Sequence, residues 1–201
     1  ATREIAKEVA LGTPVEDIRI VHNVITSHVV PEMIAESGAT PVRTRVGHSF
    51  IKAEMATAKA VFGGEHSAHY YFRDFWYADT GMLAALHVLA ALGEASAPLS
   101  QLGAAYERYV ASGEINSRVD DVPAAKARVL EWAASHGPVE VDELDGSTVT
   151  HRGEPMWWFN VRASNTEPLL RLNVEAADRG TMESVRDEVL ERIRATTEGQ
   201  D

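Results

Sequence analysis

Cysteine is absent from this 201-residue sequence, so disulfides, thiolate metal sites and a cysteine nucleophile are excluded. Long apolar runs are also missing: none approaches the ~20 residues of a membrane-spanning helix, and the N-terminus does not have the layout of a signal peptide. Basic residues are few, because 19 Lys and Arg stand against 30 Asp and Glu and leave a formal net charge of −11. Binding to a nucleic-acid backbone needs clustered Lys and Arg. We therefore expect a cytoplasmic protein with no membrane and no nucleic-acid partner.

The overall composition is that of a folded protein. Hydrophobic residues make up 45% and charged residues 24% of the chain, which is too apolar for a disordered tail. The length allows one large domain or two small ones. Residues 3–11 have the helical spacing of apolar positions without a preceding cap or initiating Met, so we expect a fragment of a longer protein.

The first half of the sequence alternates strand and helix patterns. Strands are predicted at 17–25, 41–46 and 61–62. Helices are predicted from a cap at Ser27 to Gly38, and at 49–59, 79–92 and 98–110. Strands separated by helices of this length form βαβ units. Residues 1–111 are therefore predicted to form an α/β domain, with helices on a mixed, mostly parallel sheet.

The order of elements changes after a predicted turn at 112–116. A helix is predicted at 124–135, strands follow near 139–141, 147–151, 157–162 and 169–175, and a last helix spans 181–194. Consecutive strands flanked by helices are typical of an α+β domain with an antiparallel sheet. This smaller domain is predicted at 112–201.

The loop at 162–168, with Arg171 after it, offers the groups that a phosphate dianion needs. Two arginines supply planar donors, Ser164 and Thr166 supply hydroxyls, and Asn165 and backbone N–H groups complete a concave turn. A hairpin loop whose Ser and Asn side chains satisfy its own backbone explains the same composition. Both interpretations stay open on composition alone.

A second polar loop, 63–69, follows a predicted buried strand, where α/β domains place ligands. Its two glycines permit close backbone approach. Glu65 can accept from sugar hydroxyls, Ser67 can donate or accept, and His69 can exchange protons near neutral pH. Two alternatives are a metal site of Glu65, His66 and His69, whose spacing matches no usual zinc pattern, and a glycine turn with solvated polar residues.

A third candidate is the strand-to-helix junction at 45–52, whose N–H groups form an end that suits anions. The simpler interpretation has Ser49 capping the helix and His48 packing. The aromatic run 70–77 is predicted to serve the core or a domain interface, since its flanks lack the Lys residues expected of a base-stacking surface.

Five segments of the sequence form an ordered set: TRVGHSFIK (44–52), GGEHSAHYYF (63–72), ADTG (78–81), SGEIN (112–116) and WWFNVRASNTEPLLRLNVEA (157–176). In this order they resemble the phosphomannomutase/phosphoglucomutase family. Members of that family have four domains, and the resemblance covers only the third, which reads the sugar, and the fourth, which binds phosphate. The phosphoserine loop and the aspartate-rich metal loop of the first two domains have no counterpart in this sequence.

The resemblance implies the C-terminal part of a phosphohexomutase, an isomerase that interconverts hexose 1-phosphate and hexose 6-phosphate through a hexose 1,6-bisphosphate. Its partners would be the hexose phosphate and the missing N-terminal domains. Those domains would hold the Mg²⁺ of the full-length enzyme, so no metal site is expected in this chain, and the chain alone is expected to be inactive. A non-catalytic sugar-phosphate binding module and a fragment of a phosphoglucosamine mutase are the alternatives.

Site residues are carried over from the family by match. Glu65 and Ser67 would contact sugar hydroxyls, and His48 and His69 would border the reacting phosphoryl group. The phosphate that is not transferred would be held by Arg162, Ser164, Asn165, Thr166 and Arg171. Two departures stand out: Ala68 replaces a frequent Gly, and residues 23–26 lack a Lys that the family often places there.

Overall fold

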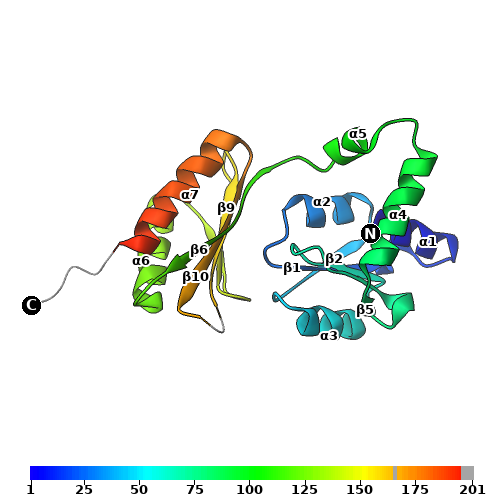
Figure 1. Ribbon diagram of the computed structural model, residues 1–201, viewed down its shortest axis with the longest axis horizontal. Coiled ribbons are helices and arrows are strands. Elements are labelled where there is room, and N and C mark those ends of the chain that lie inside the picture. Colours follow the sequence, from blue (N-terminus) through cyan, green and yellow to red (C-terminus); the bar gives the residue numbers. More distant parts are fainter. Residues whose placement is uncertain (165–166, 196–201) are drawn as a thin grey trace, which may run out of the picture. The chain divides into compact units, whose positions relative to one another are not determined.

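The computed structural model describes residues 1–164 and 167–195. The chain divides into two compact units, Ala1–Arg108 and Tyr109–Asp201, and each unit contains one sheet of five strands. Figure 1 shows the elements of both units along the chain. Over the two described ranges, no helix is long and apolar enough to cross a bilayer.

The first unit holds a mixed sheet with the strand order β2-β1-β3-β4-β5. Its strands are β1 (Arg19–Asn23), β2 (Thr40–Thr44), β3 (Phe62–Gly64), β4 (Tyr70–Phe72) and β5 (Ala78–Asp79). Its helices are α1 (Thr2–Ala10), α2 (Val29–Glu36), α3 (His48–Ala58), α4 (Gly81–Glu94) and α5 (Leu99–Ala104), with short 3₁₀ turns η1 (Val15–Asp17) and η2 (Arg73–Phe75).

The expectation of a mixed sheet with helices is confirmed for this unit, but the sheet is only partly parallel and not mostly so. β1 pairs in parallel with β2 and β3, but β4 pairs antiparallel with both β3 and β5. The five residues between β3 and β4 are too few for a parallel crossover, so the chain turns back as a hairpin. The aromatic run therefore forms the strand β4 followed by the turn η2, with Tyr71 and Phe72 buried and Trp76 exposed.

Helices cover both faces of the first sheet (Figure 1). On one face α3 packs Ile51 and Met55 against Val21 and Tyr71. On the other face α1 and α2 pack over β1, with Ile20 in the same cluster. The helix predicted at 98–110 is much shorter, because α5 ends at Ala104 and the chain is already in a strand at Val110.

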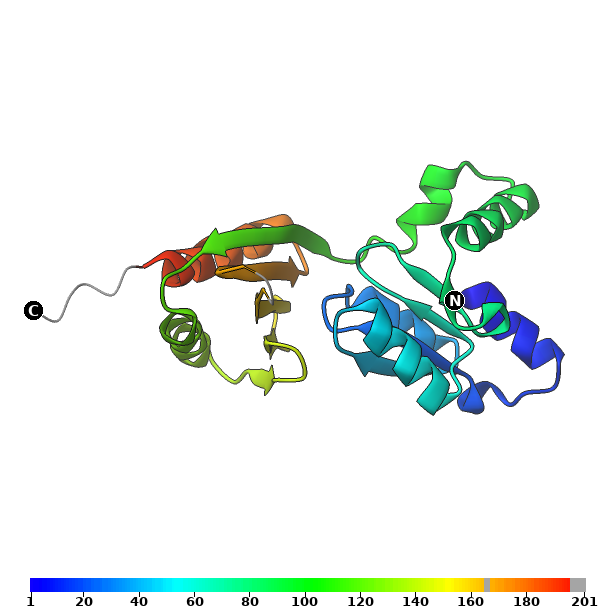
Figure 2. The same ribbon diagram turned by 60° about the horizontal axis from the view of Figure 1, so that its bottom comes forward.

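The second unit is an antiparallel sheet, as the sequence predicted, and its helices lie on one face. Its strands β6 (Val110–Arg118), β7 (Glu140–Asp142), β8 (Ser147–His151), β9 (Trp157–Ala163) and β10 (Leu169–Ala176) follow the order β6-β10-β9-β8-β7. Figures 1 and 2 show α6 (Val122–Ser135) and α7 (Arg179–Arg194) together on one side of this sheet. Alternate strand residues such as Phe159 and Leu172 fill the core beneath the helices.

The turn predicted at 112–116 is wrong, because these residues lie inside β6. The misleading signal is Gly113, whose φ of +71° belongs to the left-handed region. Its position faces a register shift between Asn173 and Glu175 on the neighbouring β10. Glycine there accommodates a β-bulge and does not end the strand.

Candidate functional site

The loop at residues 65–69 is the tip of the β3–β4 hairpin. The N–H of Glu65 donates to the carbonyl of His69 at 3.0 Å, and the N–H of Ala68 donates to the carbonyl of Glu65 at 3.1 Å. Ala68 has φ of +63°, a conformation that glycine adopts without steric cost. The departure from the family pattern therefore keeps the tight turn at the expense of backbone strain. Ser67 and His69 are exposed on this tip.

Glu65 is buried and ties three segments of the first unit together. Its Oε1 accepts from the Tyr71 hydroxyl at 2.5 Å, and its Oε2 accepts from the Gly47 N–H at 3.2 Å and the Asn23 amide at 3.4 Å. Burial, followed by this hydrogen bond, raises the pKa of Tyr71. Asn23 is the last residue of β1 and lies in the stretch 23–26, which lacks the Lys expected from the resemblance. Its side-chain amide donates to Glu65 at this position. A carboxylate oxygen can accept more than one donor, which leaves Glu65 capacity for a ligand hydroxyl.

His48 is the first residue of α3 and is exposed. The helix begins after Gly47, whose φ is +127°, and no side chain caps it. The interpretation in which Ser49 caps the helix is therefore wrong, because Ser49 lies within the first turn. The Glu65 bond to the Gly47 N–H holds the start of α3 beside the hairpin tip.

His69 forms a close pair with Asp79 of β5. Its Nδ1 lies 2.6 Å from Asp79 Oδ2, while Asp79 Oδ1 accepts from the Tyr70 N–H at 2.9 Å. The hydrogen bond to Asp79 raises the pKa of His69. Burial alone would raise the pKa of Asp79, but the bonds from His69 and Tyr70 outweigh it, with His48 adding to them, and that pKa is lowered.

In the second unit, the two arginines predicted to bind phosphate are direct cross-strand partners. Arg162 on β9 pairs in register with Arg171 on β10. Glu114 of β6 bridges them: its Oε1 accepts from Arg171 at 2.9 Å and its Oε2 accepts from Arg162 at 3.3 Å. The Nε atoms of both arginines are buried and have no partner among the described residues. Each guanidinium has five N–H donors, so most remain for an anion.

The same face of the sheet continues as a polar row away from the arginines. Asn173 pairs in register with Asn160, two residues along each strand from Arg171 and Arg162. Both amides are buried, and neither atom of the Asn173 amide has a partner within the described parts of the chain.

The turn between β9 and β10 follows directly on the arginine pair. The Ser164 N–H donates to the carbonyl of Leu169 at 2.9 Å, which closes the hairpin. The predicted ligands Asn165 and Thr166 lie outside the described residues. The structure thus brings Arg162, Ser164 and Arg171 to one end of the hairpin.

Sequence analysis missed several partners of the predicted side chains. Asp79 and Glu114 lie in the segments ADTG and SGEIN, where the sequence predicted no role for either acid. In residues 1–164 and 167–195, no three His, Asp or Glu side chains gather as metal ligands. The set of Glu65, His66 and His69 therefore does not fit a metal, and no Mg²⁺ site is formed by the described residues.

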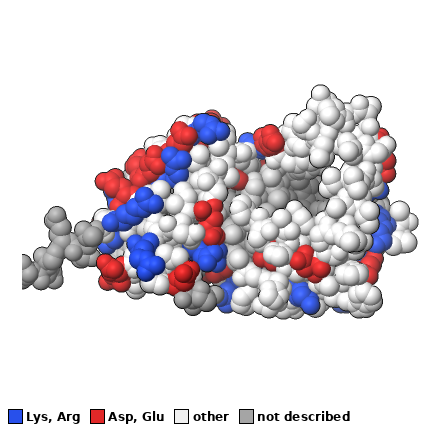
Figure 3. Space-filling view, viewed as in Figure 1, with Lys and Arg blue, Asp and Glu red and all other residues white. Residues whose placement is uncertain are grey.

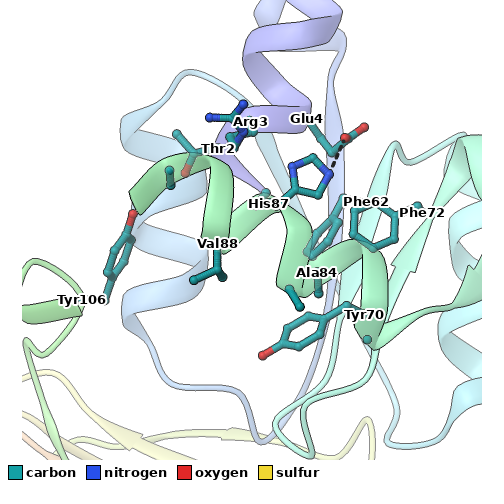
Figure 4. A pocket seen from close by; sticks show the side chains of 14 residues that line it. Thr2, Arg3, Glu4, Phe62, Tyr70, Phe72, Ala84, His87, Val88 and Tyr106 are labelled. Atoms are coloured by element: carbon teal, nitrogen blue, oxygen red, sulfur yellow. Dashed lines mark ion pairs between the residues drawn. The ribbon is translucent and has the colours of Figure 1, made fainter. Parts of the chain in front are cut away.

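A separate apolar cavity of about 510 Å³ lies under α4 and contains none of the predicted site residues. Figure 4 shows His87 of α4 pointing into it, where its Nε2 lies 3.3 Å from a Glu4 carboxylate oxygen and its ring stacks on Phe72. α4 has no buried residue, and Leu89 is 61% exposed. Figure 3 shows that the face of the first unit bearing α2, α4 and α5 is largely uncharged, whereas charges are dense over α7.

Comparison with known proteins gives matches over nearly the whole chain. Residues 3–109 match the family described as phosphoglucomutase/phosphomannomutase, alpha/beta/alpha domain III, and residues 114–192 match the C-terminal domain of phosphoglucomutase/phosphomannomutase. A phosphohexose mutase of Xanthomonas campestris is 40% identical over 91% of this chain and 39% of its own length. The chain therefore spans about two fifths of that relative's length.

Solved structures show the same architecture. A phosphoglucomutase/phosphomannomutase family protein of Burkholderia thailandensis superposes with a TM-score of 0.76 at 25% identity, over 99% of this chain and 42% of that one. The N-acetylphosphoglucosamine mutase of Aspergillus fumigatus, solved with GlcNAc-6P and magnesium, has a TM-score of 0.60 at 14% identity, over 95% of this chain and 41% of that one, and shares the fold.

Proposed function

Because this chain belongs to the phosphoglucomutase/phosphomannomutase family, we propose that it is the C-terminal part of a phosphohexomutase, with sugar recognition in the first unit and phosphate binding in the second. The observation that carries the proposal is the in-register pairing of Arg162 and Arg171 next to Ser164, which closes the β9–β10 hairpin. Glu114 bridges the two arginines but offsets only one of their two positive charges, so a further anion beside the pair is favourable.

The reaction of the longer protein is the interconversion of hexose 1-phosphate and hexose 6-phosphate, with a hexose 1,6-bisphosphate as intermediate. Either phosphate must fit the same site in turn, so the second unit binds a phosphate dianion without regard to the end of the sugar that bears it. Arg162, Ser164 and Arg171 do this together with Asn165 and Thr166. Guanidinium forks suit such a dianion because its shape is the same on every hexose.

The first unit reads the sugar. Glu65 and Ser67 bind its hydroxyls, and His48 and His69 border the phosphoryl group that moves. Mg²⁺ and the phosphoryl donor belong to N-terminal domains outside this sequence, so the chain alone does not turn over hexose phosphates. A cytoplasmic location follows from the phosphorylated substrate.

Two titrations of each variant, one with hexose phosphate and one with inorganic phosphate, test this division of roles. Ser67→Ala removes a hydroxyl from an exposed loop and should weaken binding of hexose phosphate while leaving inorganic phosphate binding unchanged. Glu65→Gln should do the same, since it turns part of an acceptor into a donor. Ser100→Ala on α5, also exposed, is the matched control and should change neither. Loss of inorganic phosphate binding in Ser67→Ala, or an unchanged hexose phosphate affinity in both loop variants, would contradict the proposal.

A further inference from the structure

The carboxylate of Asp79 is held in place by backbone contacts as well as by its ion pair with His69. Asp79 lies on β5 directly opposite Tyr71 of β4, so strand register sets its distance from the hairpin tip. The Tyr70 N–H fixes one carboxylate oxygen at 2.9 Å, which aims the other at His69 Nδ1, 2.6 Å away. The next residue, Thr80, donates its N–H to the carbonyl of Tyr70 at 2.9 Å and anchors the same stretch.

The charges around His69 favour a proton on its ring. Asp79 on β5 raises the pKa of His69 most strongly, and Glu65, directly after β3, raises that pKa by a smaller amount. His48 at the start of α3 acts on the Asp79 carboxylate. The side chains of His69 and Asp79 are 51% and 38% exposed, so solvent reaches the pair.

We propose that Asp79 is a positioning residue for His69: it accepts a hydrogen bond from the Nδ1–H, fixes the ring and leaves Nε2 as the nitrogen that exchanges a proton with the sugar. This inference rests on the proposed function. When a sugar hydroxyl attacks the phosphoryl group of a phosphoserine or phosphosugar donor, its proton passes to Nε2 as the oxygen–phosphorus bond forms. The bond from phosphorus to the donor oxygen breaks, and that oxygen keeps the electron pair. The imidazolium that results stays paired with the Asp79 carboxylate, and the reverse reaction returns the proton.

Nuclear magnetic resonance of the ring nitrogens of His69 tests the positioning role in this chain without any turnover. In the wild type the neutral ring should carry its proton on Nδ1. Asp79→Ala should move that proton to Nε2 and lower the titration midpoint of His69. Asp79→Asn has one oxygen, which the Tyr70 N–H occupies, so its amide NH2 faces Nδ1 and donates to it. This variant should therefore also move the proton to Nε2 and lower the midpoint, without removing the bond that anchors β5 to Tyr70. Asp74→Asn is the control, because Asp74 bears the same charge but bonds to Arg73 and Lys7.

An unchanged tautomer and midpoint in folded Asp79→Ala would overturn the proposal. If that variant failed to fold, an unchanged midpoint in Asp79→Asn would overturn it alone. A separate addition of hexose phosphate to the wild type tests the proposed sugar site, since ligand at the hairpin tip should shift the His69 signals. Absence of that response would refute the sugar site and leave the His69–Asp79 pair intact.

Discussion

Arg162→Ala should weaken phosphate binding more than any other single change in the second unit. Only 13% of its side chain is exposed, against 31% for Arg171, so solvent screens its charge less. The chain as a whole carries a formal charge of −11, so attraction for an anion must come from this local arginine pair.

The size of the loss follows from the bonds that disappear. A hydrogen bond to a charged group contributes about 1.5–3 kcal/mol, which corresponds to a fall in affinity of roughly tenfold to hundredfold. The fall should be the same for every hexose phosphate and for inorganic phosphate. Calorimetric titration with inorganic phosphate at fixed ionic strength measures it directly.

The control for this change is Arg179→Ala. Arg179 begins α7, is 75% exposed and pairs only weakly with Glu183 at 3.7 Å, so its removal takes away the same charge from the helical face. An Arg162→Ala variant that binds phosphate as the wild type does, or an Arg179→Ala variant that loses as much, would refute the assignment of the anion site to the β9–β10 hairpin.

Glu114→Gln perturbs the same cluster from the opposite side. The carboxylate neutralises one of the two arginine charges and engages a terminal nitrogen on each. Glutamine keeps the size but removes the charge, so the guanidinium groups repel each other until an anion arrives. We expect a lower free energy of unfolding without ligand and a larger gain in melting temperature when phosphate is added. Weaker phosphate binding would instead mean that Glu114 holds the arginines in place for the anion.

Three further changes test the first unit through its free energy of unfolding. Gly63→Ala should cost roughly 1–3 kcal/mol, because its Cβ would lie 2.6 Å from a buried methionine sulfur, whereas Gly93→Ala, with open space around it, should be neutral or slightly stabilising. Ala68→Gly should raise the free energy of unfolding by up to about 1 kcal/mol, because glycine adopts a positive φ without strain. The greater freedom of glycine in the unfolded chain reduces this gain. Glu8→Gln removes the charge and one of the two oxygens that accept from Arg73 at 2.6 and 3.0 Å. Since the Arg73 hydrogen bond lowers the pKa of Glu8, the wild-type advantage should be present above the ordinary glutamate pKa and lost as pH falls through the lowered one.

Long elements with clear periodicity were predictable from the sequence. The strand expected at 157–162 is β9, and the helix expected at 181–194 is α7, because alternating and 3.6-residue patterns record directly which side faces the core. The capping aspartates Asp121 and Asp178 extend α6 and α7 two residues beyond the predicted starts. The local sequence was therefore sufficient to predict these elements.

Short strands were not predictable, because their existence depends on a partner distant in the sequence. β4 and β5 contain three and two residues, too few for a periodic pattern. They are strands because β4 pairs with β3 and β5 pairs with β4. β6 was hidden by Gly113, which is typical of turns and also of bulges. Only the neighbouring strand decides between the two.

The same limit applied to the candidate site: in each acid–base pair, the sequence suggested a role for the basic side chain and none for its acidic partner. The basic side chains were predictable because Arg and His gathered in a polar turn are typical of anion binding and proton transfer. Their acidic partners were not, since strand register alone brings Asp79 to His69 and Glu114, 57 residues away, to Arg171. Both acids lie on the strand that neighbours the loop-bearing hairpin, where an exposed carboxylate is ordinary by composition. A carboxylate beside each basic group sets how tightly that group holds a proton or an anion, so substitutions at these two acids should alter binding and pH dependence while the predicted ligand-contacting residues stay unchanged.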